Sequence, residues 1–237
     1  MASALVLGAT GMTGRKLVAE LLASPHIAKV QVVGRRKAGE NERQAWPNQE
    51  KLVETIVNFD KLDEAKDAFA GHDVGYCCLG TTRADAGSAE AFVKIDYAIP
   101  LQAAKMFKEN GKGDQHYMLV TASGSNASSM FLYPRTKGEL ERDVQALGFS
   151  RLTILRPGLL DYRPDPRPSR RAWEEYAAPV VSFLAPRSGI IGVGLLGRAM
   201  RLLTEDWLAA RAGGRTASEA GVRVLENAAI LDVAERK

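Results

Sequence analysis

Short apolar runs alternate along the chain with longer segments of helical periodicity. Each run is rich in apolar or β-branched residues and ends at a turn residue, which is typical of strands buried on both faces of a sheet. The runs span residues 4–8, 29–34, 53–59, 74–80, 116–122 and 151–158. The segments between them carry apolar stripes that predict helices; the clearest are Leu17, Val18, Leu21 and Leu22, then Leu62, Ala65, Ala68 and Phe69, then Leu140, Val144 and Leu147.

This alternation predicts the fold class. Strands that alternate with helices indicate an α/β fold in which helices cover both faces of a parallel sheet. Because the crossovers are right-handed, the sheet becomes doubly wound, a Rossmann fold with ligands at the carboxyl ends of the strands. Residues 85–110 predict a further helix, in which Pro100 causes a kink or occupies a first turn.

The alternation weakens after residue 158. Residues 161–171, DYRPDPRPSRR, predict an exposed loop, and residues 210–221 predict a second surface excursion. The remaining C-terminal pattern is helical and partly apolar, and residues 189–197 are predicted to be buried core. We therefore expect one ligand-binding domain over residues 1–237, with residues 159–237 packed on it as a small substrate-side cap.

Composition and charge narrow the class of protein. With 237 residues, of which 46% are hydrophobic, the chain has enough apolar side chains for one globular core. Its net charge is +4 and its basic residues are interleaved with acidic ones, so we expect no nucleic-acid partner. No apolar run approaches the roughly 20 residues that span a bilayer. His26, His72 and His116 lack the spacing of metal ligands, and no metal site is predicted.

Two observations lead us to expect a cytoplasmic protein. The fold begins at once, in MASALVLGATG, without the basic region and long apolar stretch of a signal peptide. Cys77 and Cys78 are adjacent in a predicted strand, where neighbouring side chains point to opposite faces, so a disulfide between them would be strained. We therefore predict two reduced thiols that serve as packing residues.

A glycine-rich turn joins the first predicted strand to the first helix. Gly8 permits a tight turn, Gly11 lets backbone amides approach a pyrophosphate, and Gly14 lets the helix pack closely on the sheet. The helix N-terminus offers unpaired N–H groups to the phosphates, and Thr10 and Thr13 can add hydroxyl donors. The order of strand, glycine turn and helix favours dinucleotide binding over the alternative, an ordinary strand-to-helix connection.

The second strand ends in VVGRRK, and this ending bears on the choice of cofactor. In NAD-binding units an acidic residue about 20 residues past the glycine loop holds the ribose 2′-hydroxyl. Arg35 and Arg36 occupy that place here. A guanidinium pair binds a 2′-phosphate through charge-assisted bonds, so NADP (as NADPH) is the predicted cofactor. The alternative is a solvated basic turn.

Tyr133 and Lys137 stand four residues apart, the spacing that places two side chains on one face of a helix. They follow the fifth strand, whose carboxyl end also opens toward the ligand crevice. Pro134 suits the first turn of the helix. A nearby ammonium favours proton release by a phenol, so the pair predicts general-acid catalysis, with Ser123, or Thr121 as second choice, binding a substrate carbonyl. The alternative is two solvated residues on an ordinary helix.

The sequence resembles the short-chain dehydrogenase/reductase superfamily, and within it the atypical branch of Tat-interacting-protein-type oxidoreductases. The resemblance covers nearly the whole chain. It rests on LGATGMTGR, VGRRK, GHDVGYCCLGTTRADAG, FLYPRTKGELE, LRPGLL and LENAAI. The DVGYCCLGTTR and FLY…KGE blocks are much more specific than the glycine loop.

The resemblance implies roles for individual residues. Tyr133 matches the catalytic tyrosine of the family, and Lys137 matches the lysine that holds the nicotinamide-ribose hydroxyls. The other implied NADPH contacts are Thr10, Gly11, Met12 and Thr13 at the phosphates, Arg35 and Arg36 at the adenosine phosphate, Leu79 and Gly80 after the fourth strand, and Leu160 and Arg167 closing over the cofactor.

The chain departs from the family pattern at two places. The paired serines of the family at the fifth strand end fall on Thr121 and Ala122, which leaves the catalytic hydroxyl open between Ser123 and Thr121. An asparagine that many classical members keep after the fourth strand has Asp96 at its equivalent, which weakens a proton relay of the classical type.

Three functions follow as hypotheses. The first is an NADPH-dependent oxidoreductase that reduces a carbonyl or a related small molecule, with Tyr133 as the general acid and Lys137 tuning it. The second is an NADP(H)-sensing regulatory protein that binds a protein partner without turnover, since fold alone does not imply catalysis. The third, a sugar-nucleotide epimerase, is disfavoured because the segment after residue 158 is short for a nucleotide-sugar lobe.

Overall fold

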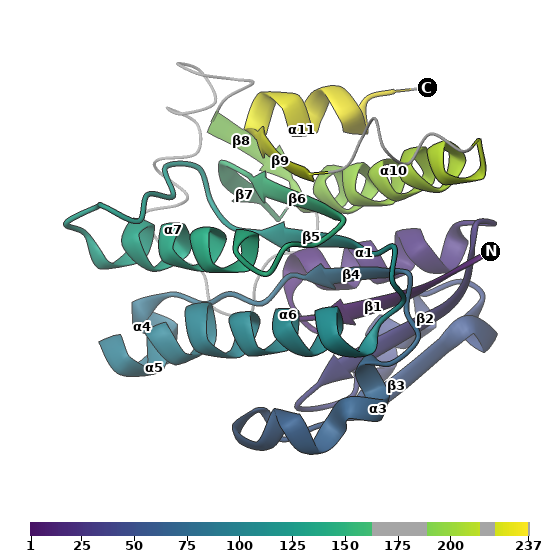
Figure 1. Cartoon of the computed structure of the whole chain (residues 1–237), viewed down its shortest axis with the longest axis horizontal. Helices are drawn as coiled ribbons and strands as arrows, with labels where there is room; N and C mark the ends of the chain where they lie inside the picture. Colours follow the sequence, from purple (N-terminus) through teal and green to yellow (C-terminus); the bar gives the residue numbers. More distant parts are fainter. Residues whose placement is uncertain (163–188, 214–220, 237) are drawn as a thin grey trace.

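Seven parallel strands form the central sheet of this computed structural model, which describes residues 1–162, 189–213 and 221–236 (Figure 1). Their order across the sheet is β3-β2-β1-β4-β5-β6-β9. The predicted doubly wound α/β fold is confirmed, and its switch point lies between β1 and β4. The strands are β1 Ala2–Leu7, β2 Ile27–Gly34, β3 Leu52–Ile56, β4 Val74–Cys77, β5 His116–Val120, β6 Arg151–Arg156 and β9 Gly221–Glu226.

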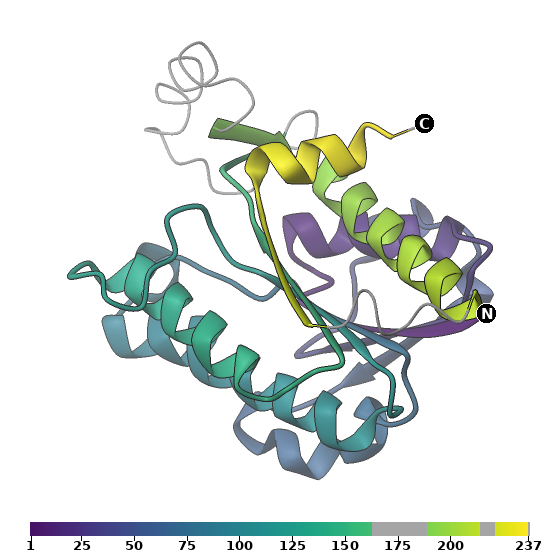
Figure 2. The ribbon, with the colours of Figure 1, turned by 45° about the horizontal axis from the view of Figure 1, so that its top comes forward.

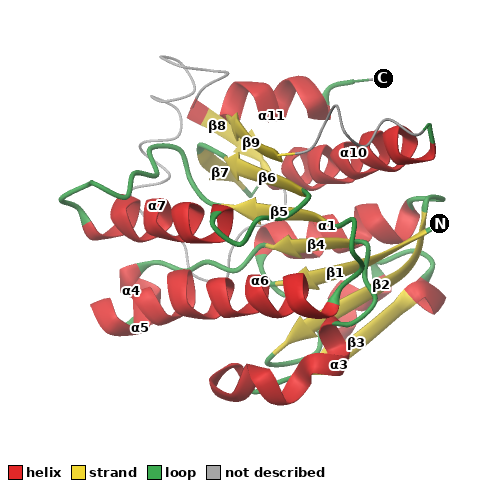
Figure 3. Ribbon diagram, in the orientation of Figure 1, coloured by secondary structure: helices red, strands yellow, loops and turns green. Residues whose placement is uncertain are grey.

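Helices cover both faces of this sheet (Figures 2 and 3). On one face lie α1 (Met12–Ala23), α10 (Val193–Ala212) and α11 (Asn227–Ala234). On the other lie α3 (Lys66–Phe69), α6 (Ile99–Asn110) and α7 (Leu132–Gln145). Shorter elements are α2 (Glu40–Gln44), α4 (Arg83–Ala86), α5 (Ala89–Val93), the 3₁₀ turns Gln49–Lys51 and Phe59–Ala65, and the strand pair β7 (Leu159–Asp161) and β8 (Ile190–Gly192).

The predicted apolar stripes supply the core beneath each helical layer. Leu17 and Leu21 of α1 are fully buried in one cluster together with Met200 of α10. The two helices approach closely at Gly197, where a Cβ atom would lie 3.0 Å from the backbone nitrogen of Leu17. Burying a large aliphatic side chain contributes about 1.5–3 kcal/mol, so this helix pair is a major part of the apolar core.

The C-terminal third contributes directly to the layers of the fold. Residues 221–226, which the sequence pattern placed in a helical tail, form the edge strand β9 beside β6. That expectation was wrong because most β9 side chains are exposed, so the strand lacks the continuous apolar run of a buried one. Residues 163–171 of the expected loop and most of the 210–221 excursion lie outside the described residues.

Residues 89–110 form one helical path with an irregularity in its middle. A π-helical turn, Lys94–Ala98, separates α5 from α6. In this turn the Ile99 N–H donates a backbone hydrogen bond to the Lys94 carbonyl. Pro100 follows at the start of α6 and has no N–H to donate to the carbonyl four residues earlier, which is the carbonyl of Asp96. Of the two predicted possibilities for Pro100, it occupies the first turn of a helix, and a widened π-helical turn precedes it.

Candidate functional site

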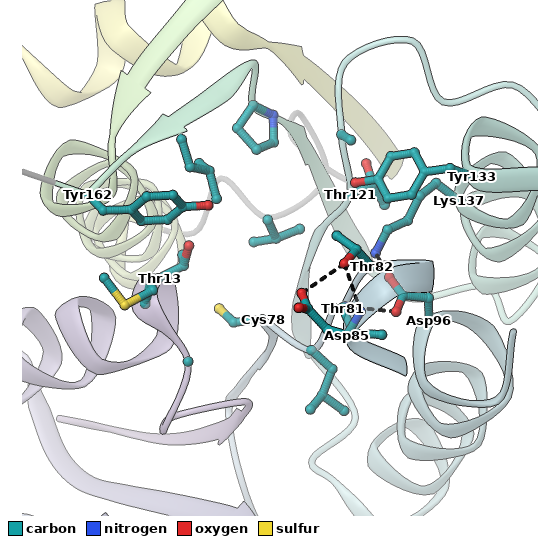
Figure 4. A pocket seen from close by; sticks show the side chains of 18 of the residues that line it. Thr13, Cys78, Thr81, Thr82, Asp85, Asp96, Thr121, Tyr133, Lys137 and Tyr162 are labelled. Atoms are coloured by element: carbon teal, nitrogen blue, oxygen red, sulfur yellow. Dashed lines mark hydrogen bonds and ion pairs between the residues drawn. The ribbon is translucent and has the colours of Figure 1, made fainter. Parts of the chain in front are cut away.

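A cleft of about 830 Å³ opens at the carboxyl ends of β1, β4, β5 and β6 (Figure 4). The glycine loop and the start of α1 form one wall, and the loop after β4 forms the floor. The first turns of α7 form the opposite wall, and residues 157–162 close the cleft. The cleft therefore lies where ligands bind in a doubly wound sheet.

The glycine loop has the geometry that the sequence predicted. Gly8 adopts φ +83°, and a Cβ atom there would lie 2.7 Å from the backbone carbonyl of Cys78. A Cβ atom at Gly14 would overlap the carbonyl oxygen of Gly8, so α1 approaches the loop as closely as its backbone permits. Gly11 closes the turn by donating its N–H to the Gly8 carbonyl at 2.9 Å.

The N-terminus of α1 faces the cleft without a side-chain cap. Gly11 is its N-cap residue and has no side chain to accept a hydrogen bond from the first turn. The first N–H groups of the helix are therefore available, and they carry the positive end of the helix dipole. Thr10, Met12 and Thr13 line the cleft beside them. This arrangement suits a pyrophosphate.

Arg35 and Arg36 follow β2, and both are exposed. They line a second hollow of about 370 Å³ beside the glycine loop, and Arg36 also lines the main cleft. Among the described residues that line this second hollow there is no carboxylate. The nearby Glu54 is already engaged, because it accepts the Ala38 N–H at 2.9 Å and lies 3.6 Å from Arg43.

Tyr133 and Lys137 come from the first turns of α7 and line the same side of the cleft (Figure 4). Tyr133 is 41% exposed, and its ring packs against Phe92 with ring centroids 5.8 Å apart. Within the described residues its hydroxyl has no hydrogen-bond partner. Lys137 is buried, and its Nζ lies 2.7 Å from Oδ1 of Asp96.

Asp96 is the site residue whose part the sequence pattern missed. It is fully buried in the π-helical turn, and its Oδ2 accepts the backbone N–H of Thr81 at 2.8 Å. Burial is the largest single influence on the pKa of Lys137 and lowers it, but the charge of Asp96, the contact with its carboxylate and the nearby Tyr133 together raise it by more, so the net pKa is raised and Lys137 remains an ammonium. Burial also raises the pKa of Asp96, against the opposing effect of Lys137.

The two hydroxyls predicted as catalytic, those of Ser123 and Thr121, lie in different surroundings. Ser123 is exposed and is not among the residues that line the cleft. Thr121 lines the cleft, but its hydroxyl donates to Glu141 at 2.6 Å, and Glu141 is held by Arg156 at 2.5 Å. Thr121 is therefore occupied by a structural network.

The remaining predicted contacts divide into two groups. Leu79, Gly80 and Leu160 line the cleft, whereas Arg167 lies outside the described residues. Tyr162 also lines the cleft and faces it from the side of α1, but no motif had marked it (Figure 4).

Both cysteines are free thiols, as predicted. Cys77 is buried in the core, whereas Cys78 lines the cleft. Burial raises the pKa of Cys77 to about 11 and raises that of Cys78 further. Neither thiol is therefore a thiolate near neutral pH, which argues against cysteine chemistry in the cleft.

The sheet order, the glycine loop and the cleft define a nucleotide-binding Rossmann fold. The chain belongs to the NAD(P)H-binding family, whose family model matches residues 8–176. Protein HTATIP2 of Rattus norvegicus is 42% identical over 195 residues, which cover 77% of this chain and 78% of the relative. The predicted family resemblance is thereby confirmed.

Two further comparisons extend this result. Protein FMP52, mitochondrial, of Candida albicans is 43% identical over 161 residues, which cover 67% of each chain. A putative NAD-dependent epimerase/dehydratase from Bacillus halodurans is 17% identical, with a TM-score of 0.67 over 99% of both chains. That structure shares the fold, and the similarity extends no further.

The fungal comparison corrects one prediction. We expected a cytoplasmic protein, but the Candida albicans relative is named a mitochondrial protein, and so is one from Aspergillus fumigatus at 33% identity. The cytoplasmic prediction was wrong because it rested on general features of the N-terminus and the thiols. No helix in the described part of the chain is long and apolar enough to cross a membrane.

Proposed function

We propose that the protein is an NADPH-dependent oxidoreductase that reduces a carbonyl or a related small molecule, with Tyr133 as the general acid. One observation carries the proposal: Tyr133 and Lys137 line the same cleft as the glycine loop and Arg36. A glycine loop at a helix N-terminus, an exposed phenol and a buried ammonium around one cavity suit hydride transfer coupled to proton donation.

The residues present fit NADPH. Gly8 and Gly14 leave no room for a Cβ atom, and the uncapped α1 N-terminus offers backbone donors for the pyrophosphate. Arg35 and Arg36 would hold the 2′-phosphate in the hollow beside the loop, whose described lining carries no competing carboxylate. When bound, NADPH supplies the hydride.

The chain supplies the proton and the environment of the reaction. Tyr133 donates its hydroxyl proton to the substrate oxygen, and the Lys137 ammonium stabilises the phenolate that remains. Leu159 and Leu160 line the cleft with apolar surface, which strengthens these interactions by excluding water. Ser123 has no part in this proposal because it lies outside the cleft lining.

One observation favours the second candidate, an NADP(H)-sensing regulatory protein. Met130 and Phe131, directly before α7, are 92% and 78% exposed, beside the rim residue Tyr133. A partner that covered them would contact the cofactor cleft. In this candidate, NADPH binding would change partner affinity, and no substrate would be turned over.

A single experiment separates the two candidates. Wild type and Tyr133→Phe are assayed for NADPH oxidation against a panel of aldehydes, ketones and quinones, after NADPH binding has been measured by calorimetry. The reductase proposal expects turnover in the wild type and its loss in the variant. Binding without turnover across the panel, together with NADPH-dependent capture of a partner that survives Tyr133→Phe, supports the sensor instead.

The names of the fungal relatives also support a proposed location in mitochondria. Fractionation of cells that express the tagged full chain tests it. Recovery of the protein in the mitochondrial fraction is the expected result, and recovery only in the cytosol would contradict it.

A further inference from the structure

Asp96 contacts two parts of the cleft that are distant in the sequence, α7 and the loop after β4. Its Oδ1 lies 2.7 Å from the Lys137 ammonium on α7, and its Oδ2 accepts the Thr81 N–H from the loop after β4 (Figure 4). That loop, residues 78–82, lines the cleft where the cofactor is proposed to lie. One carboxylate thus holds the lysine and the loop together.

The burial of the pair makes this link stiff. Asp96 is fully buried, and the side chain of Lys137 is 4% exposed. Gly80 packs directly against them, since a Cβ atom there would lie 3.4 Å from the lysine Nζ and 3.5 Å from Asp96 Oδ1. An ion pair in such surroundings is screened little by solvent, and removing one partner leaves a buried charge without compensation.

The backbone around Asp96 is also unusual. The residue sits within the π-helical turn Lys94–Ala98, directly before the helix that begins with Ile99 and Pro100. A widened turn changes the direction in which its side chains project, and such turns frequently occur at functional sites. Here the local irregularity accompanies a carboxylate that faces the cleft and contacts Lys137.

We infer that Asp96 is a positioning residue that makes the orientation of Lys137 and the conformation of loop 78–82 one coupled unit. The inference rests on the proposed function, because it concerns the same cofactor cleft. It gives Asp96 a task that the asparagine of the classical enzymes could share only in part, since an amide carries no charge to hold the ammonium.

The test is a double-mutant cycle on NADPH affinity, measured by calorimetry. Asp96→Asn and Lys137→Met should each weaken binding about tenfold or more, and the double variant should be no weaker than the poorer single variant within about twofold. Such non-additivity marks residues that act as one unit. The inference would be overturned if the double variant lost NADPH affinity by the product of the two single losses, or if Asp96→Asn bound NADPH like the wild type.

The chain offers a matched control at the opposite end of β4. Asp73 is also a buried aspartate that accepts a backbone N–H, from Ser3 at 2.9 Å, and pairs with a lysine, Lys112, at 2.7 Å, and in addition with Arg211 at 3.1 Å. Asp73→Asn should lower the melting temperature about as much as Asp96→Asn and leave NADPH affinity unchanged. If both variants weaken NADPH binding equally, Asp96 is merely structural.

A measurement without cofactor separates this inference from the proposed function. Amide hydrogen exchange of loop 78–82 in the free protein should speed up in Asp96→Asn and also in Lys137→Met, but not in Asp73→Asn. Unchanged exchange of loop 78–82 in Lys137→Met would contradict the inferred coupling between the lysine and the loop. Absence of NADPH binding in the wild type would instead refute the proposed function and leave the exchange result to decide the inference.

Discussion

Tyr133 and Lys137 lie one helical turn apart on α7, yet Tyr133 is 41% exposed at the rim of the cleft and Lys137 is 3% exposed beneath it. A solvated pair on an ordinary helix would show two exposed side chains. The difference places a phenol where a substrate can reach it and an ammonium where solvent cannot compete for its charge.

The first prediction concerns the phenol of Tyr133. Tyr133→Phe removes one hydroxyl that has no partner among the described residues and keeps the ring contact with Phe92, so folding and NADPH affinity should be nearly unchanged. Loss of general-acid catalysis should lower kcat by about 10²–10⁴. Steady-state kinetics on a substrate from the screen checks it, with Tyr97→Phe, outside the cleft lining, as the control. Catalysis that survives the change would return the pair to a structural role.

The second prediction concerns cofactor choice. We expect NADPH to bind more tightly than NADH by about 1–2 kcal/mol, the scale of charged hydrogen bonds. Replacing Arg35 and Arg36 by alanine should erase most of this preference and leave NADH affinity little changed, because only the 2′-phosphate contacts are lost. Calorimetric titration of both nucleotides is the measurement, and Arg142→Ala, an exposed change on α7, is the control. Equal affinities in the wild type contradict the assignment.

The third prediction contrasts two glycines of the same loop. A Cβ atom at Gly11 meets only the Gly8 carbonyl oxygen, at 3.2 Å, so Gly11→Val should fold but lose NADPH and NADH binding because the side chain blocks the pyrophosphate. At Gly14 a Cβ atom would overlap that oxygen, so Gly14→Ala should lower the free energy of unfolding by about 1–3 kcal/mol or more. Urea titration and ligand-induced thermal shifts separate the two effects. Wild-type NADPH affinity in a folded Gly11→Val would place the phosphate site elsewhere.

The fourth prediction concerns pH. His116 is fully buried against Thr153, and burial holds its pKa well below the ordinary value. As the pH falls, the unfolded chain therefore binds a proton at His116 before the folded chain does. The contribution of His116 to the free energy of unfolding is fully present above about pH 6.5 and decreases below it, by up to about 1.4 kcal/mol per pH unit. Unfolding free energies at pH 7.5 and 5.5 test this. His116→Gln should make the decrease smaller, although His72, whose pKa burial also lowers, retains part of it. An equal decrease in wild type and His116→Gln would refute the assignment.

The sequence predicted the parts of the fold that leave strong local patterns. The glycine turn, the six predicted strands and the helices with apolar stripes all appear near their expected positions. β9 was not predicted because an edge strand with mostly exposed side chains carries little hydrophobic signal. The other edge strand, β3, was predicted because its sequence keeps an apolar and β-branched run.

The catalytic hydroxyl and Asp96 show a different limit. Ser123 was predicted as the catalytic hydroxyl because it follows a strand. The direction of its side chain, however, depends on the loop, which bends at Gly124 with φ +78°. Asp96 was judged by its departure from the family asparagine, since its partners Lys137 and Thr81 are distant in the sequence. Which side chains meet is decided by backbone geometry that no local spacing reports.

The contact of α1 with α10 has a consequence for biosynthesis. The residues to which the proposed function gives a role all precede residue 163, whereas α10 and β9 leave the ribosome later. Until they arrive, the apolar stripe of α1 and one edge of β6 lack their native cover. At about 5–20 residues per second this interval lasts seconds, long enough for aggregation or chaperone capture. Ribosome-stalled chains whose emerged part ends at residue 162 should therefore be degraded by protease faster than released full-length protein.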